Sequence, residues 1–214
     1  MMKIKKFTFN PFFENTYVIY DEKSKEAAVI DPGNSDENET EELFGFAESN
    51  NLKIRYLINT HCHIDHVFGN SAVKRKFNPE FLAPEPDMFL LRAAKKQGEL
   101  FGVEVENSPE PDQFITEQTE LTLGEFKLNF IFTPGHTPGE YCVYNTAGNI
   151  LIAGDVLFNE GIGRTDLWGG DMDTLLASIK EKLYALPDET LVYCGHGDET
   201  TIGHEKKHNP FIKA

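Results

Sequence analysis

The feature that most constrains this chain is a dense group of potential metal ligands: His61, His63, Asp65 and His66 fall within six residues. They directly follow residues 54–60, whose apolar composition is that of a buried strand. Side chains in extended chain repeat every second residue, so His61 and His63 can bind one metal ion from the same side. Asp65 shares that phase, whereas His66 is displaced and can reach past the first ion. The alternative is a solvated loop, but imidazoles packed this densely gain nothing without a cation.

Three further candidate ligands each follow a short apolar run that predicts a strand. His136 stands in TPGHTPG, Asp155 in AGDVLF and His196 in CGHGDET. Each has an ordinary alternative when taken alone, either a surface histidine or a carboxylate that caps a turn or helix. Together with the HCHIDH motif they supply seven nitrogen and oxygen ligands. That set is enough for two ions that share a carboxylate and keep open positions for water.

Apolar periodicity predicts an alternation of strands and helices along the 214 residues. The predicted strands are 3–9, 16–20, 27–31, 54–60, 81–82, four runs between 120 and 153, and 191–194; the predicted helices are 36–50, 65–76, 86–100 and 172–186. Strand-rich and helical segments come in two similar successions, which indicates an α/β fold. No repeat or flexible linker interrupts the chain, so we expect a single domain over residues 1–214.

Charge and composition exclude several classes of partner. Thirty-five acidic against twenty basic side chains give a formal charge of −15, which argues against a nucleic-acid-binding surface. Apolar runs are too short for a transmembrane helix, and the N-terminus lacks the apolar stretch of a signal peptide. Cys62, Cys142 and Cys194 show no disulfide spacing. We therefore expect a cytoplasmic protein with no membrane or nucleic-acid partner; its oligomeric state is not readable from the sequence.

With these motifs in their order, the chain resembles the metallo-β-lactamase-fold hydrolases, and among them the glyoxalase II-like (hydroxyacylglutathione hydrolase-like) family. The resemblance runs from about residue 31 to residue 211. It implies a four-layer αββα sandwich with the site at one edge of the two sheets. It also implies a ligand set for two metal ions: His61, His63 and His136 on the first, Asp65, His66 and His196 on the second, and Asp155 bridging them.

Asp31, in VIDPG, matches an early aspartate that in this superfamily usually lies behind the metal ligands. An Asp-Pro-Gly turn explains that residue equally well. The commonest true β-lactamases carry Arg where His66 stands and Cys where Asp155 stands, and another group keeps the histidine but has no acidic bridge. The resemblance to β-lactamases is therefore weaker at the site itself.

Two alternatives to a hydrolase stay open. The persulfide dioxygenase branch also carries THCHxDH and a GRTD segment, but holds one iron through the residues that match His61, His136 and Asp155. The ending CGHGDETTIGHEKKHNPF is more similar to the short glyoxalase II-like hydrolases. A zinc-stabilised scaffold without catalysis is the second alternative; a structural zinc site is closed by four ligands, and this set has too many for one ion.

The expected reaction is hydrolysis of a thioester such as S-D-lactoylglutathione. Two divalent ions, zinc in the first place with iron or manganese as other fits, would share a hydroxide, because zinc lowers the pKa of bound water from 15.7 to about 7. Asp65 and Asp155 are the predicted catalytic carboxylates. A thiolate leaves without a strong general acid, since thiols are acidic. Cys62 lies between two ligands and faces away, so we expect it to pack in the core rather than act as a nucleophile.

Three residues are candidates for binding the small-molecule thioester. Arg164 can grip a substrate carboxylate with two parallel hydrogen bonds, and its alternative is an ion pair with Asp166 or Asp171. Tyr141 and Trp168 are candidates for the pocket lining, with core packing as the alternative. Full-length glyoxalase II proteins carry a further helical C-terminal segment that supplies much of the glutathione pocket. We expect this chain to lack it, so an ester of another low-molecular-weight thiol fits as well.

Overall fold

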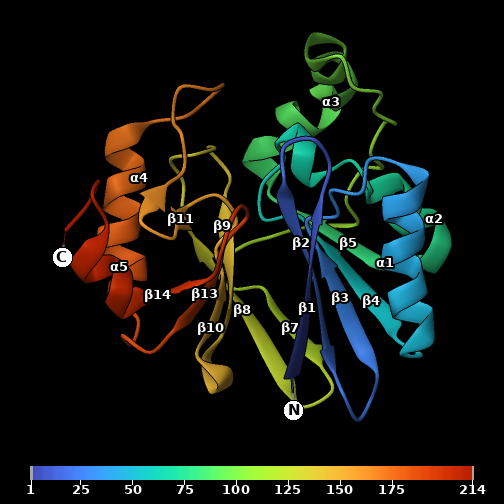
Figure 1. Ribbon diagram of the computed structural model, residues 1–214, viewed down its shortest axis with the longest axis horizontal. Helices are drawn as coiled ribbons and strands as arrows, with labels where there is room; N and C mark the ends of the chain where they lie inside the picture. The colour runs from blue at the N-terminus through green and yellow to red at the C-terminus, as the bar shows by residue number, and fades with distance from the viewer. Residues whose placement is uncertain (1, 214) are drawn as a thin grey trace. The chain divides into compact units, whose positions relative to one another are not determined.

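The computed structural model describes residues 2–213, and the chain divides into two compact units. The first unit runs to Phe114 and includes Thr122–Phe126; the second comprises Ile115–Leu121 and the chain from Lys127 onward. Each unit contains strands of a mixed six-stranded β-sheet, with helices packed against the sheet (Figure 1). The prediction of one domain over residues 1–214 stays a prediction.

The first sheet has the strand order β1-β2-β3-β4-β5-β6. Its strands are β1 (Met2–Phe9), β2 (Glu14–Asp21), β3 (Glu26–Ile30), β4 (Lys53–Ile58), β5 (Glu80–Ala83) and β6 (Gln113–Phe114). The first three form an antiparallel meander, and β3 to β6 run parallel. Parallel neighbours need crossover connections, which here contain the helices. This arrangement brings the end of β4, where the HCHIDH motif begins, beside the end of β3.

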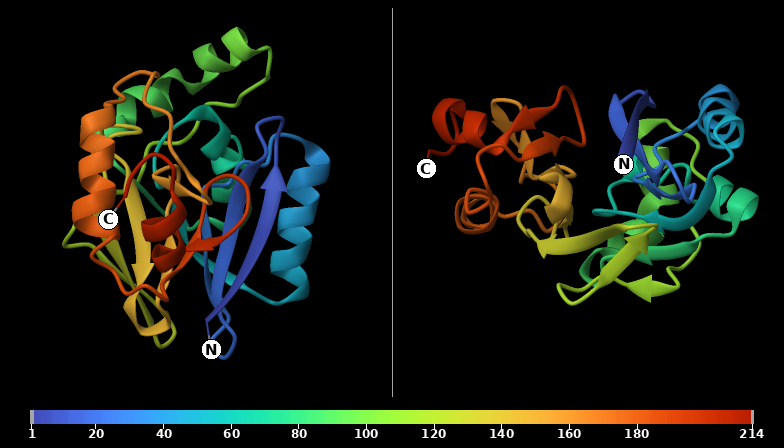
Figure 2. Two further views of the ribbon diagram at one scale, coloured as in Figure 1. Left: turned by 60° about the vertical axis from the view of Figure 1, so that its left-hand side comes forward. Right: turned by 90° about the horizontal axis from the view of Figure 1, so that it is seen from below.

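Three α-helices belong to this unit: α1 (Glu37–Ser49), α2 (Asn70–Phe77) and α3 (Met88–Phe101). Asp36 caps α1 by accepting a hydrogen bond from the Glu39 N–H, so the helix begins where the sequence predicts. Leu43 and Ala47 of α1 join the same apolar cluster as Leu57 of β4. Figure 2 shows α1 and α2 beside the strands of this sheet.

The predicted helix 65–76 is wrong at its start. Residues Ile64–His66 form a single 3₁₀ turn, and α2 begins only at Asn70. The His66 carbonyl accepts a hydrogen bond from Asn59 Nδ2 (3.0 Å), and the Asn70 N–H bonds to Val67 in a 3₁₀ pattern. The predicted helix 86–100 is likewise wrong at its start: Glu85–Asp87 form a 3₁₀ turn, and α3 begins at Met88.

The second sheet has the order β14-β13-β10-β9-β8-β7. Its strands are β7 (Glu120–Leu123), β8 (Phe126–Phe132), β9 (Tyr141–Asn145), β10 (Ile150–Ile152), β13 (Leu191–Tyr193) and β14 (Thr200–Thr201), and a separate hairpin pairs β11 (Leu157–Phe158) with β12 (Gly161–Ile162). The four strands predicted between residues 120 and 153 are confirmed. β10 and β13 run parallel, which places the ends of both strands at the same edge.

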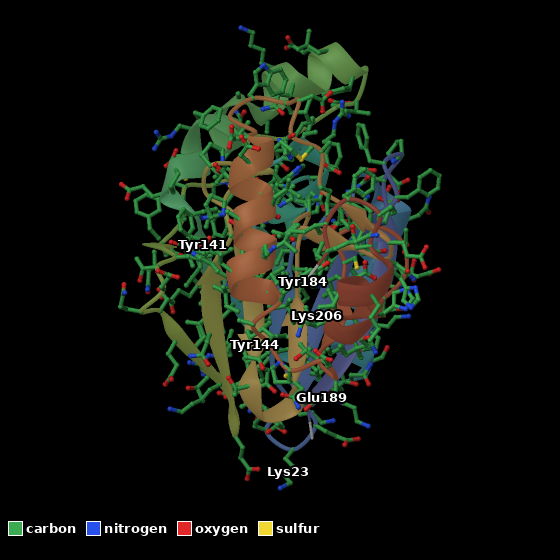
Figure 3. The ribbon with its side chains drawn as sticks, turned by 90° about the vertical axis from the view of Figure 1, so that its left-hand side faces the viewer. Lys23, Tyr141, Tyr144, Tyr184, Glu189 and Lys206 are labelled. Atoms are coloured by element: carbon green, nitrogen blue, oxygen red, sulfur yellow. The ribbon has the colours of Figure 1, made fainter. Side chains whose placement is uncertain are left out.

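Helix α4 (Met172–Ser178) continues as a π-helical turn, Ile179–Leu183, and its apolar side packs with Leu151 of the second sheet. Helix α5 (Ile202–His208) is a short element that periodicity did not predict. The hydroxyl of Tyr184, which is labelled in Figure 3, donates to the Glu205 carbonyl of α5 (3.0 Å). Within residues 2–213, no helix combines the length and apolar character that a membrane span requires.

Candidate metal centre

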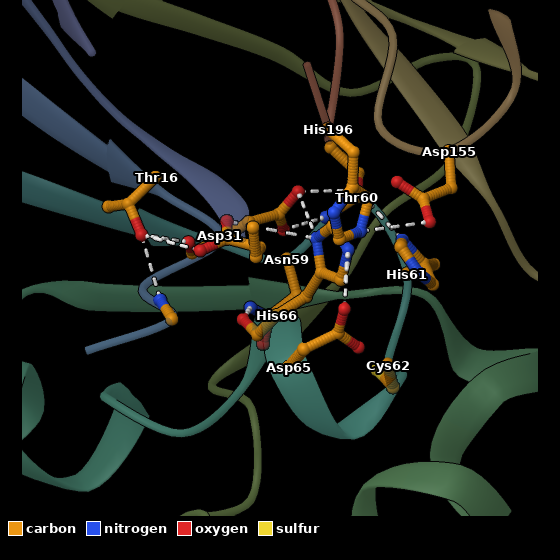
Figure 4. Close-up of polar contacts among 12 residues, drawn as sticks. Thr16, Asp31, Asn59, Thr60, His61, Cys62, Asp65, His66, Asp155 and His196 are labelled. Atoms are coloured by element: carbon orange, nitrogen blue, oxygen red, sulfur yellow. Dashed lines mark hydrogen bonds and ion pairs between the residues drawn. The ribbon is translucent and has the colours of Figure 1, made fainter. Parts of the chain in front are cut away.

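The first unit gathers four predicted ligands in the loop after β4. The His61 and His63 rings are perpendicular with centroids 5.0 Å apart, and those of His61 and His66 are 4.1 Å apart. All three imidazoles are buried. Asp65 Oδ2 lies 3.7 Å from His66 Nε2 (Figure 4). Three buried imidazoles and a carboxylate in one loop form a donor set that suits a divalent cation.

Asp31 lies behind two of these histidines, at the end of β3. Its carboxylate accepts hydrogen bonds from the Thr60 N–H (2.7 Å) and hydroxyl (2.6 Å), and Oδ2 is 3.3 Å from His66 Nδ1 (Figure 4). The Thr60 hydroxyl oxygen is also 3.1 Å from His61 Nδ1. Asp31 has φ +49°, a left-handed conformation that aspartate tolerates better than most residues. Contacts on the Nδ1 side fix each ring and direct its Nε2 toward a metal.

Sequence reasoning missed three residues that support this loop. Glu14 is fully buried, and its Oε1 lies 3.9 Å from His66 Nδ1. Burial raises the pKa of Glu14 well above its ordinary value, against an opposing effect of His66. Asn59 donates to the His66 carbonyl, and Asn10 donates to the Asp65 carbonyl (3.0 Å). The one signal in the sequence was an acidic residue, Glu14, shortly before the apolar run at residues 17–20.

The second unit brings His136, Asp155 and His196 together. Asp155 Oδ2 lies 3.5 Å from His136 Nε2 and 3.4 Å from His196 Nε2; Figure 4 labels Asp155 and His196. Two tetrahedral ligands, each 2.0–2.1 Å from one zinc ion, are roughly 3.4 Å apart. One carboxylate oxygen therefore stands at ligand-to-ligand distance from two imidazoles, so it can share a metal ion with each of them.

Helix α4 holds the turn that carries His136. The Ser178 hydroxyl donates to the Pro134 carbonyl (2.7 Å), and the Asp171 N–H donates to Gly135 O (2.8 Å). Gly135 has φ +139°, and a Cβ there would lie 2.3 Å from the Leu175 backbone. Only glycine fits against the helix at this point, which explains the Pro-Gly pair before the histidine.

The predicted substrate residues lie in the second unit. Both oxygens of Asp166 accept 2.7 Å hydrogen bonds from the exposed Arg164 guanidinium, which lowers the pKa of Asp166 to about 2. The main chain of Arg164 also reaches the site, since its carbonyl lies 2.6 Å from His136 Nδ1 and favours Nε2 as the metal-binding nitrogen. Trp168 is 46% exposed, whereas Tyr141 is nearly buried with its ring 4.9 Å from that of Phe132.

Cys62 packs in the core, as predicted. Its side chain is fully buried, and burial raises the pKa of the thiol well above its ordinary value. Its backbone N–H donates to Asp87 Oδ2 (3.2 Å), a buried carboxylate that fixes the loop between the two flanking histidines. A neutral buried thiol is a poor nucleophile.

Comparison with known proteins identifies the family. The profile of the metallo-beta-lactamase superfamily matches residues 9–196. The chain belongs to this superfamily, which makes it a metal-binding hydrolase by class and confirms the α/β metallo-β-lactamase fold predicted from its sequence motifs. His and Asp side chains of the described residues form clusters that are able to bind metal ions.

Three relatives are similar over nearly the whole chain. It is 37% identical to the hydroxyacylglutathione hydrolase GloC of Haemophilus influenzae, over 100% of this chain and 99% of the relative. The crystal structure of the BLEG-1 B3 metallo-beta-lactamase has a TM-score of 0.90 at 36% identity, covering 99% of this chain and 100% of the other. That of TTHA1623 in a di-iron-bound form has a TM-score of 0.86 at 32% identity, covering 97% and 100%.

Proposed function

We propose that the protein hydrolyses a thioester of a low-molecular-weight thiol, such as S-D-lactoylglutathione, at a centre of two divalent metal ions. The observation that carries the proposal is the position of Asp155 Oδ2, within 3.5 Å of Nε2 on both His136 and His196. The similarity to GloC over the whole chain supports the thioester, and the similarity to a di-iron-bound protein supports two ions.

The two units divide the ligands between them. We assign His61, His63 and His136 to one ion, Asp65, His66 and His196 to the other, and Asp155 to both. This nitrogen and oxygen set suits zinc first, and iron or manganese as well. When bound, such ions ionise a water and polarise the thioester carbonyl. The catalytic work of the chain falls on Asp65 and Asp155, whose carboxylates hold the ions and offset their charge.

The substrate is a small molecule, and Arg164, Tyr141 and Trp168 are the residues we assign to its binding. The Arg164 guanidinium already binds Asp166 through two hydrogen bonds, so a substrate carboxylate would have to replace that partner. Both groups are exposed, and water and salt weaken exposed ion pairs of this kind. The exchange is therefore energetically easy.

A cytoplasmic setting and the absence of nucleic-acid and membrane partners complete the proposal. The cysteines support a reducing compartment, because Cys62, Cys142 and Cys194 are all buried and none forms a disulfide in the part of the chain that the structure describes. The formal charge of −15 supports the absence of a nucleic-acid surface.

A second candidate is hydrolysis of a β-lactam, favoured by the similarity to BLEG-1. Both reactions use the same ions and differ in the acyl group and its leaving atom, nitrogen in place of sulfur. The mononuclear persulfide dioxygenase and the zinc-stabilised scaffold stay as alternatives from the sequence motifs.

One set of assays separates these reactions. The purified protein is analysed for metal and incubated with S-D-lactoylglutathione, a chromogenic cephalosporin and glutathione persulfide, with oxygen uptake recorded. We expect about two ions per chain and loss of thioester absorbance without oxygen uptake. Faster turnover of the cephalosporin, or oxygen consumption with the persulfide and a single iron, would overturn the proposal. A metal-loaded protein inactive on all three would favour the scaffold.

A further inference from the structure

Glu140 is a fully buried carboxylate that no motif marks as functional. It follows the TPGHTPG turn and immediately precedes β9. Its carbonyl accepts a hydrogen bond from the Thr133 N–H (2.8 Å), which fixes its backbone across the turn. Its side chain points to another segment, where Oε1 accepts a hydrogen bond from the Asp155 N–H (2.7 Å).

The Asp155 N–H needs this acceptor because the chain leaves the sheet just before it. Strand β10 ends at Ile152, and Gly154 turns the backbone with φ +52°. Asp155 is only 7% exposed, so solvent does not replace a strand partner. Burying an N–H group without a hydrogen-bond acceptor destabilises the folded protein, because the group loses its bonds to water and gains none in return. Glu140 supplies the acceptor for the Asp155 N–H from the end of the TPGHTPG turn.

Gly163 and Gly195 lie close to the carbonyl and the carboxylate of Asp155. A Cβ at Gly195 would lie 2.1 Å from Asp155 Oδ1, and a Cβ at Gly163 would lie 1.9 Å from the Asp155 carbonyl oxygen. The carboxylate is therefore enclosed by backbone on one side and held through its own N–H on the other. A small displacement of Asp155 changes the distances from Oδ2 to both imidazoles.

We propose that Glu140 is a positioning residue that, through its hydrogen bond to the Asp155 N–H, sets the Asp155 carboxylate between His136 and His196 for metal binding. The inference rests on the proposed function only where that assigns Asp155 as a metal ligand; it does not depend on the thioester. The hydrogen bond acts here, not the negative charge of Glu140.

Two variants separate the hydrogen bond from the charge. Glu140→Gln removes the charge and keeps an oxygen in place to accept from Asp155. Glu140→Asp keeps a carboxylate, but its side chain is one methylene too short to reach the Asp155 N–H. Leu183→Ala is the matched control: it removes buried side chain from the apolar cluster of the same unit without contacting the ligands.

The measurement is the affinity of each metal-free protein for Zn²⁺, by competition with a chromophoric chelator, with the Co²⁺ absorption spectrum as a second readout. We expect Glu140→Asp to bind roughly tenfold more weakly with an altered Co²⁺ spectrum, since partners of ligands typically contribute 10- to 100-fold. Glu140→Gln should match the wild type in both, and Leu183→Ala should lower only the melting temperature.

Unchanged affinity and spectrum in Glu140→Asp, or a loss in Glu140→Gln as large as in Glu140→Asp, would overturn the inference. The test is independent of turnover. A wild type that binds Zn²⁺ but leaves the thioester intact would refute the proposed function, while the ranking of the variants would still decide the role of Glu140.

Discussion

The two units supply their proposed metal ligands in opposite ways. In the first, four ligands come from one six-residue loop after β4, held from behind by Asp31 and Thr60. In the second, three ligands lie far apart in sequence and each follows a different strand. The first arrangement is set mostly by local chain geometry. The second depends on contacts with α4 and Glu140, so substitutions well away from a ligand should affect it more.

The largest expected effect is that of Asp155→Asn in the second unit. A neutral amide bridges two cations poorly, so we expect loss of turnover by more than about 100-fold, beyond the effect of removing a residue that only supports a ligand. Metal content should fall as well. Elemental analysis and steady-state rates on the same preparation check both effects, and near-normal rates would show that Asp155 does not bridge.

The next effect tests whether His61 and His136 bind the same ion, as proposed. We expect His61→Ala and His136→Ala each to abolish most activity, and the double variant to be no worse than the more damaging single one, because residues that act as a unit are strongly non-additive. Rates and Zn²⁺ affinities of all four proteins complete the cycle. Losses that simply add would mean that the two histidines serve independent sites.

The smallest effects come from a pair of glycine substitutions. In Gly195→Ala the new methyl group would lie 2.1 Å from Asp155 Oδ1, and we expect roughly tenfold weaker Zn²⁺ binding, as for loss of other ligand supports. Gly45 lies within α1 with no atom within 4 Å of its would-be Cβ. Gly45→Ala should therefore stabilise the first unit by about 0.5–1 kcal/mol, and leave metal binding unchanged.

Denaturant unfolding and metal titration measure both variants. Stronger or equal metal binding in Gly195→Ala would show that the turn around Asp155 is not as tightly packed as its geometry indicates. A destabilised Gly45→Ala would show the opposite for α1, namely that the space around Gly45 is less open than its geometry indicates.

The difference between the units also explains what the sequence could predict. The HCHIDH loop could be predicted because the spacing of its residues determines which side chains point to the same side. The strands around it could be predicted from their apolar residues. Helix α1 is readable because Asp36 is a local cap. The start of α2 is not, because Asn59 binds the His66 carbonyl from a different segment.

The same reason applies to the supporting carboxylates. Glu14 and Glu140 are ordinary acidic residues in sequence, and only tertiary packing buries them beside His66 and Asp155. Helix α5 has seven residues, too few for a periodic signal. Arg164 lies in the recognisable GRTD segment. The contact that the structure shows between Arg164 and a predicted ligand, His136, is made by the main-chain carbonyl of Arg164 and not by its guanidinium.

The central claim is that His61, His63, Asp65, His66, His136, Asp155 and His196 together bind a pair of ions that share the Asp155 carboxylate. X-ray absorption spectroscopy of the metal-loaded protein tests it most directly. The account predicts nitrogen and oxygen neighbours and a second metal at about 3.5–4 Å, with that metal–metal distance lost in Asp155→Asn. A fully loaded wild type in which each ion has no metal neighbour in that range would contradict it.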